Sequence, residues 1–262
     1  MTDYTTLEIE RRGLCAWLWM NKPALHNAFD ETLIAELTAA LAALDADAGV
    51  RAVVLAGRGK SFSAGADLNW MKRQGEASVD ANLADARKLA LLYRALSSMA
   101  TPTIARVHGA ALGGGMGLAA ACDICVASTQ AAFATSEVKF GIIPAAISPY
   151  VVRAIGERQA YRYFQTAERI SAERAREIGL AHEVVAPERL DEAVQRIVDA
   201  LLAGGPLAQA AATDLIRAVA HKPVTDEVVE DTAQRIATLR ATPEAKEGLS
   251  AFLDKRPPAW LA

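Results

Sequence analysis

Residues 108–117 read HGAALGGGMG and join an apolar strand-like run, Ile104 to Val107, to an apolar helix-like run that ends near Ala121. Three successive glycines allow backbone conformations that a Cβ forbids, and they let another chain or a ligand approach closely. A glycine-rich turn at a helix start also points free N–H groups outward, where they stabilise negative charge. The turn is therefore a candidate site for an anion, or for an oxygen that becomes anionic during a reaction.

Apolar residues before and after this turn alternate between strand-like and helix-like spacing. In residues 30–44, for example, leucine and isoleucine recur with the period of an amphipathic helix. The patterns predict strands over residues 7–11, 14–20, 50–56, 104–107 and 124–127, and helices over residues 30–44 and 79–98. Strands that alternate with helices predict an α/β layered fold.

The pattern changes after about Pro149, where strand signals become few. Long helix-patterned segments follow at residues 188–202, 206–220 and 225–239. We therefore expect two parts, an α/β core over residues 1–200 and a helical C-terminal region over residues 201–262.

Composition excludes several classes of function. The chain has 262 residues, of which 52% are hydrophobic, so it can bury a large core. Its net charge of −3 provides no basic field for nucleic acid, and no apolar run approaches the roughly 20 residues that span a bilayer. The first residues, MTDYTTLE, are polar and slightly acidic, unlike a secretory or transit segment. We expect a cytoplasmic protein with neither nucleic acid nor membrane as partner.

The three cysteines, Cys15, Cys122 and Cys125, do not suit a disulfide framework because their number is odd. Cys122 and Cys125 have C-x-x-C spacing, but no second pair follows and the four histidines are scattered. Their apolar flanks predict buried core residues rather than a redox or metal site. We expect no bound metal.

Two further segments could carry chemistry. Residues 60–68, KSFSAGADL, form a small-residue loop in which a ligand could lie against the backbone, and Asp67 can cap a following helix. Glu137 stands in an apolar neighbourhood where a strand ends, and a desolvated carboxyl has a raised pKa that suits acid–base catalysis. Each feature alone is more often structural: a plain strand-to-helix loop, or a surface glutamate paired with Lys139.

Taken together, the three motifs resemble the crotonase family, the enoyl-CoA hydratases and isomerases. The resemblance rests on residues 64–67 (AGAD), the glycines at 113–115 and Ser136-Glu137, in this order and spacing. It extends from residues 21–28 (NKPALHNA) to residues 252–258 (FLDKRPP). It implies a spiral of ββα units and a helical C-terminal region that builds trimers, often paired into hexamers.

The resemblance also implies an acyl-CoA thioester as substrate and no separate cofactor, because coenzyme A is part of that substrate. Two backbone N–H groups would form an oxyanion hole, and by motif position they belong to Ala66 and Gly114. Contacts with coenzyme A are implied for Ala24, Leu25, Ala64, Asp67, Leu68, Phe252 and Lys255, the last two from a neighbouring subunit, and less specifically for Lys60.

The chain departs from the family pattern at Gly117, where two-glutamate hydratases carry their first glutamate. Glu137 remains as a single acid/base. The segment 136–152 and Gly117 resemble the bacterial methylglutaconyl-CoA and isohexenylglutaconyl-CoA hydratases, so we expect hydration of a 3-methylglutaconyl-type thioester. An empty space beside Gly117 would relieve charge repulsion and leave room for the carboxylate of that substrate.

Several alternatives remain at this stage. One carboxylate also suffices for a 3,2-enoyl-CoA isomerase. A weakly catalytic family member could bind acyl-CoA or RNA instead, whereas a serine or cysteine hydrolase lacks a convincing nucleophile–histidine pair. For the walls of the acyl pocket we expect Met71, Met116, Ile147 and Tyr150.

Overall fold

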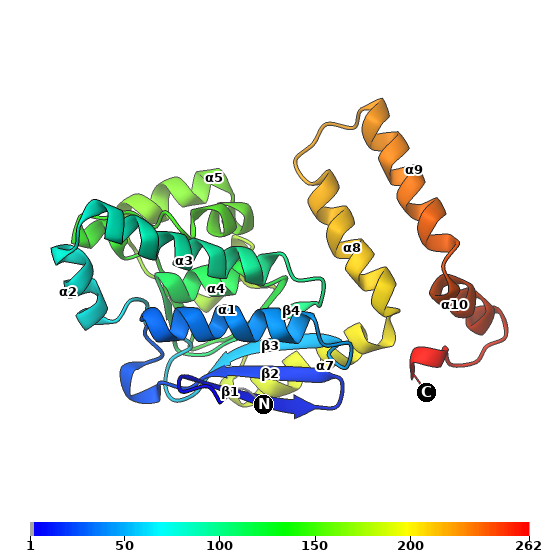
Figure 1. Cartoon of the computed structure of the whole chain (residues 1–262), viewed down its shortest axis with the longest axis horizontal. Coiled ribbons are helices and arrows are strands. Elements are labelled where there is room, and N and C mark those ends of the chain that lie inside the picture. Colours follow the sequence, from blue (N-terminus) through cyan, green and yellow to red (C-terminus); the bar gives the residue numbers. More distant parts are fainter. Residues whose placement is uncertain (1–2, 262) are drawn as a thin grey trace.

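The computed structural model describes residues 3–261, and a six-stranded sheet forms its centre (Figure 1). The strand order is β1-β2-β3-β4-β6-β9, with β1 antiparallel to β2 and the other neighbours parallel. A smaller sheet has the order β5-β7-β8. The strands are β1 Leu7–Arg12, β2 Cys15–Met20, β3 Ala52–Gly57, β4 Thr103–Val107, β5 Ala110–Leu112, β6 Ile124–Ser128, β7 Ala132–Ala134, β8 Ile170–Ser171 and β9 Glu183–Val185.

The chain repeats one unit as it passes between the two sheets. β4 leads directly into β5 and then into α4 (Gly114–Ala121). Similarly, β6 leads into β7 and then into α5 (Ser148–Thr166). After β3, a bridge from Ser63 to Ala111 joins the loop to the smaller sheet before α2 (Leu68–Glu76) begins. This succession confirms the α/β spiral of ββα units.

Both faces of the large sheet are buried, as strand β2 shows. Its residues Ala16, Leu18 and Met20 belong to one core cluster together with α1 (Glu31–Asp45). The alternate residues, which include Trp17 and Trp19, belong to a second cluster with α7 (Leu190–Ala203). Because side chains alternate between the faces of a strand, helices on both sides require an unbroken apolar run. The sequence CAWLWM meets that requirement.

The last three long helices stand apart from the sheets in Figure 1. They are α8 Pro206–Val219, α9 Asp226–Arg240 and α10 Pro243–Leu253. Arg217 of α8 connects them to the core, because its guanidinium donates to the carbonyls of Ser97 and Met99 where α3 (Val79–Ser97) ends. Helix α7 runs through position 200, and the division of the chain into residues 1–200 and 201–262 stays a prediction.

The predicted strands and helices are confirmed, with ends that shift by about two residues. Strands β5, β8 and β9 were not predicted, and β7 was expected only as a strand that ends before Glu137, because strands of two or three residues are too short for a periodic signal. Helix α5 was also missed, and it carries a kink at Gly156 (φ +75°). The three cysteines are buried and free, as predicted, and burial raises the pKa of the Cys125 thiol to about 12. Among the described helices, none has the length and apolarity that crossing a membrane demands.

Candidate active site

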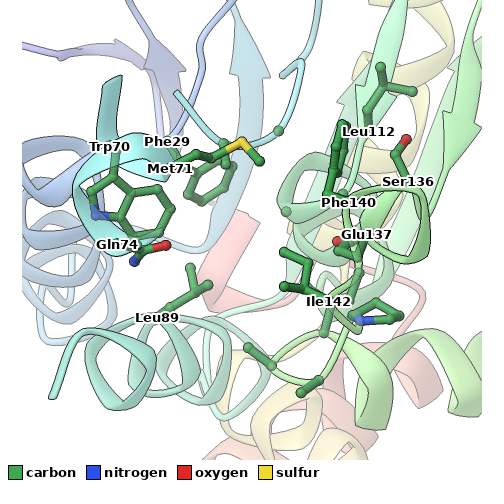
Figure 2. A pocket seen from close by; sticks show the side chains of 18 of the residues that line it. Phe29, Trp70, Met71, Gln74, Leu89, Leu112, Ser136, Glu137, Phe140 and Ile142 are labelled. Carbon is green, nitrogen blue, oxygen red and sulfur yellow. The ribbon is translucent and has the colours of Figure 1, made fainter. Parts of the chain in front are cut away.

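A cavity of about 480 Å³ opens between α2 and α3 on one side and the segment after β7 on the other (Figure 2). Trp70, Gln74 and Leu89 line the first side, and Glu137 and Ile142 face them from the second. Glu137 is the one charged residue that lines this pocket within residues 3–261. The other lining residues are Phe29, Ala64, Gly65, Ala66, Leu68, Met71, Asn82, Ala86, Leu112, Gly113, Gly114, Ser136, Phe140, Ile143, Pro144, Ala145, Ala146 and Ile147.

The glycine turn begins helix α4 at the edge of this pocket. Gly113 has φ +49° and ψ −115°, a conformation open to glycine. Its N–H donates to the carbonyl of Ala134 at 2.8 Å. Gly114, the next residue, is the first of the helix, where backbone N–H groups have no intrahelical acceptor. Its N–H has no acceptor among the described residues, so it is available to a ligand.

The small-residue loop presents a second free N–H. Phe29 forms a parallel bridge with Ala66: the N–H of Phe29 donates to Gly65 O at 2.7 Å, and the N–H of Asp67 donates to Phe29 O at 2.8 Å. In such a bridge, the backbone groups of the middle residue point away from the partner strand. The N–H of Ala66 therefore faces away from Phe29, and within residues 3–261 it has no acceptor.

These two loops and Glu137 come together. A Cβ placed on Gly65 would lie 3.1 Å from Leu112 O, next to the glycine turn. A Cβ placed on Gly113 would lie 3.1 Å from Glu137 Oε1 and 3.9 Å from Gly65 Cα. The loop of Gly65, the turn of Gly113 and the segment of Glu137 are distant in the sequence but meet around one point. Larger residues at either glycine would fill the space between them.

Glu137 follows β7 and begins a single 3₁₀ turn, Glu137–Phe140. Its side chain is half-buried, and Oε2 is shielded from solvent without a hydrogen-bond partner among the described residues. The alternative of a surface ion pair with Lys139 is therefore wrong. Burial raises the pKa of the Glu137 carboxyl above its ordinary value. A perturbed acid in an apolar pocket beside free N–H groups is a candidate for proton transfer.

The residues implied for coenzyme A divide into three groups. Ala64 and Leu68 line the pocket, whereas Asp67 caps α2 by accepting from the N–H groups of Asn69 and Trp70 at 2.9 and 3.1 Å. Ala24 and Leu25 lie in an exposed 3₁₀ turn outside the lining, joined to the loop by the hydrogen bond from Ala64 N to His26 O at 2.9 Å. Lys60 is exposed and also lies outside the lining.

Phe252 and Lys255 form the third group, which the fold does not bring to the pocket. Phe252 lies near the end of α10 and is 80% exposed, and Lys255 follows the helix. Figure 1 shows α10 on the opposite side of the molecule from α2. Neither residue lines the pocket.

Two of the four expected wall residues are wrong. Met71 and Ile147 line the pocket. Met116 is fully buried in the core, and Tyr150 packs against Tyr93 with ring centroids 5.8 Å apart, outside the lining. Both residues lie on helices that contact the core as well as the pocket, α4 for Met116 and α5 for Tyr150, and each of these side chains is on a face turned away from the pocket.

Sequence reasoning also missed two sets of residues that shape the site. The run Phe140–Ile143 forms much of one wall, and its exposed apolar side chains were the available signal. Asn27 is fully buried and fastens the loop of Ala24 and Leu25, because its Nδ2 donates to the carbonyls of Arg58 and Ser61, both at 2.9 Å. A polar residue in the middle of a motif gives no sign of burial by itself.

The structure contradicts the expected space beside Gly117. A Cβ on this residue would lie 2.2 Å from Ile147 Cγ2 and 3.0 Å from Tyr93 Cε1. Gly117 is buried and does not line the pocket. The place of the missing glutamate is therefore filled by protein, so it offers no room for a substrate carboxylate.

A spiral of ββα units that carries a small-residue loop, a glycine turn and a buried glutamate around one pocket defines the crotonase fold class. The chain belongs to the enoyl-CoA hydratase/isomerase family, whose profile matches residues 11–262. A solved structure of an enoyl-CoA hydratase from Shewanella pealeana is 41% identical, with a TM-score of 0.94 over 97% of this chain and 96% of the other.

Two relatives with specific names are similar over almost their full lengths. The crotonyl-CoA hydratase of Syntrophomonas wolfei is 33% identical over 97% of this chain and 96% of its own. The 2,3-dehydroadipyl-CoA hydratase of Escherichia coli is 32% identical over 96% of this chain and 97% of its own. Their names differ in the acyl group and agree on the reaction.

Proposed function

We propose that this protein is an enzyme, an enoyl-CoA hydratase that adds water across the 2,3 double bond of an acyl-CoA thioester. The observation that carries the proposal is the pairing of a buried, unpartnered Glu137 carboxyl with two free N–H groups, those of Ala66 and Gly114. The hydratase names of relatives that cover nearly the whole chain support the same reaction.

The proposed mechanism uses one carboxylate twice. Ionised Glu137 takes a proton from a water molecule while the water oxygen bonds to C3 of the substrate. The electron pair of the double bond moves toward the thioester, whose oxygen gains negative charge and accepts hydrogen bonds from Ala66 and Gly114. Glu137 then gives its proton to C2, which restores the thioester and the ionised acid. Each fixed donor is worth roughly 3–4 kcal/mol of barrier, judging from oxyanion-hole deletions elsewhere.

The raised pKa of Glu137 suits this double role. A carboxylate with an ordinary pKa would be a weaker base toward water, whereas catalytic efficiency rises as the pKa approaches the working pH. The apolar pocket provides that shift without a second acid. The 3,2-isomerase alternative would use the same groups to move a proton between C2 and C4.

For the acyl group we propose the 3-methylglutaconyl type that the segment 136–152 indicates. A relative named for the dehydroadipyl group, another chain that ends in a carboxylate, supports an acidic substrate. Repulsion from ionised Glu137 would direct this carboxylate to the opposite wall. Gln74 lies there, and its uncharged amide can donate hydrogen bonds (Figure 2).

Binding of coenzyme A would involve the loops that carry Ala24, Leu25, Ala64, Asp67 and Leu68, with Lys60 near the phosphates. Phe252 and Lys255 can contribute only from a neighbouring subunit, so we propose a homotrimer, alone or paired in a hexamer. Large apolar side chains exposed on α8 to α10 support assembly: Leu215, Ile216, Val229, Ile236, Leu249, Phe252 and Leu253. We also propose a cytoplasmic location.

The deciding experiment incubates the purified protein with crotonyl-CoA, a 3-enoyl-CoA and 3-methylglutaconyl-CoA, and measures product masses. Hydration adds one water, whereas a product of unchanged mass would establish the isomerase. Glu137→Gln should lose almost all activity, with exposed Glu76→Gln of α2 as the matched control. A Glu137→Gln protein that keeps most of its hydratase rate would disprove the mechanism. Crotonyl-CoA as a tenfold better substrate would refute the acyl assignment alone.

A further inference from the structure

The place of the glutamate that is missing at position 117 is filled by two side chains from distant segments. Ile147 reaches it from the residue that precedes α5, and Tyr93 reaches it from α3. Their nearest atoms would lie 2.2 and 3.0 Å from a Cβ on Gly117. Tyr93 has no exposed surface, although it carries a hydroxyl. Burying a hydroxyl costs free energy unless the hydroxyl forms a hydrogen bond, so Tyr93 needs a partner within the protein.

The partner is the glycine turn itself, because the Tyr93 hydroxyl donates to the carbonyl of Gly114 at 3.0 Å. A Cβ on Gly114 would lie 2.8 Å from this hydroxyl and 3.1 Å from the Phe29 ring. Burial, and in second place the charge of Glu137, raise the pKa of Tyr93 well above its ordinary value. The hydroxyl therefore stays protonated and remains a donor at every working pH.

The hydrogen bonds around Gly113 and Gly114 form a series of anchors. The N–H of Gly113 is held by Ala134 O at 2.8 Å, and the carbonyl of Gly113 accepts from Gly117 N at 3.1 Å. Tyr93 then holds the carbonyl of Gly114. The peptide between Gly113 and Gly114, which carries the free N–H, thus lies between anchored neighbours. Glycine imposes little restraint of its own on these dihedrals, so the anchors fix the direction of that N–H.

We infer that Tyr93 is a positioning residue for the thioester, because its hydroxyl holds the carbonyl of Gly114 and so restrains the orientation of the residue that carries the free N–H. The inference rests on the proposed function, in which that N–H polarises the thioester oxygen. Tyr93 does not line the pocket and touches no substrate, so it acts through the turn. Loss of the hydroxyl should weaken polarisation of the thioester and leave its affinity nearly unchanged.

The test compares Tyr93→Phe with Tyr163→Phe. Tyr163 is also buried, and its hydroxyl accepts from Arg174 at 3.2 Å, away from the pocket. Tyr93→Phe should lower kcat about tenfold with KM within about twofold, because catalysis depends on donor placement more than ground-state binding does. The control should lose stability to a similar extent and keep its kcat.

A spectroscopic signal separates positioning from stability. The absorption band of a bound 2,4-dienoyl-CoA shifts to the red when the thioester carbonyl is polarised. Tyr93→Phe should reduce this shift and Tyr163→Phe should not. If Tyr93→Phe fails to fold, two side chains of tyrosine size replace it: 4-aminophenylalanine at position 93 keeps a donor, and 4-methylphenylalanine has none. The first should retain the shift and the second should lose it.

The outcomes for Tyr93 and for the proposed function are distinguishable. Unchanged kcat and an unchanged red shift in Tyr93→Phe, with activity lost in Glu137→Gln, would overturn the positioning role alone. Activity retained in Glu137→Gln would overturn the proposed mechanism whatever Tyr93 does. Equal shifts with 4-aminophenylalanine and 4-methylphenylalanine would also refute the positioning role.

Discussion

Gly117 and Ile147 should behave as a coupled pair, and the structure gives the size of the coupling. Gly117→Ala would place a methyl group 2.2 Å from Ile147 Cγ2, far inside van der Waals contact. Alanine in a helix is favoured over glycine by about 1 kcal/mol, but overpacking a filled core costs about 1–3 kcal/mol. The 2.2 Å separation is more than 1 Å shorter than a ~3.5 Å van der Waals contact, so the overpacking cost should lie in the upper part of its range. We expect a net loss of about 1–2 kcal/mol in unfolding free energy.

The same substitution should cost less in an Ile147→Ala background, because Cγ2 is then absent, although Cβ of residue 147 and Cε1 of Tyr93 still lie 2.8 and 3.0 Å from the new methyl group. Ile147→Ala alone should cost about 2–5 kcal/mol as a buried truncation. The coupling between the two changes should be about 1 kcal/mol, above the ~0.3–0.5 kcal/mol within which independent sites add. Gly75→Ala in α2 is the control, since a Cβ there meets nothing within 4 Å, and it should stabilise the protein slightly.

Urea unfolding of the four proteins of this cycle, at one fixed protomer concentration, measures these free energies. Strictly additive effects would show that Ile147 does not occupy the place beside Gly117. The space of the missing glutamate would then not be filled by Ile147. A stabilised Gly117→Ala protein would lead to the same conclusion.

Four further predictions concern single residues. Glu137 holds its proton more tightly in the folded state, so Glu137→Gln should raise stability at neutral pH, and urea midpoints should show the gain vanishing below the unfolded value of 4.5. In the wild type, the acidic limb of kcat/KM should lie above pH 4.5. Gly113→Ala should cost about 1–3 kcal/mol of backbone strain and abolish hydration, whereas Gly13→Ala, also at positive φ, should keep full activity. Arg217→Met should lower stability by about 1 kcal/mol and speed hydrogen exchange in α8.

The sequence was informative wherever a feature depends on neighbours along the chain. The glycine turn is followed by a helix because glycines 113–115 permit the turn and the apolar run continues beyond it. Asp67 caps α2, and the period of leucines predicts α1, with Asp30 as its cap through a 2.8 Å bond to Leu33 N. The desolvation of Glu137 was likewise predictable from its apolar flanks.

Features that depend on tertiary packing were beyond the sequence. Gly117 and Ile147 are separated by 30 residues, and Tyr93 lies on a different helix from either. The short strands of the small sheet have no period of their own, since they are stabilised by pairing with one another. The apolar flanks of Glu137 and the motif positions of Ala66 and Gly114 therefore pointed to the candidate site, whereas the surroundings of these residues required the fold.

In the proposed mechanism, the division of roles between backbone and side chains allows a single acid to serve. The two N–H groups belong to the main chain, so Ala66 and Gly114 need only remain small for the donors to persist. An acid is a side chain, and its loss at position 117 leaves a buried space that water or protein must fill. Here Ile147 fills it, which removes a second charge and deepens the burial of the pocket around Glu137. Gly117→Glu alone would therefore meet Ile147 before it met a substrate, and a second acid can be accommodated only when both positions change together.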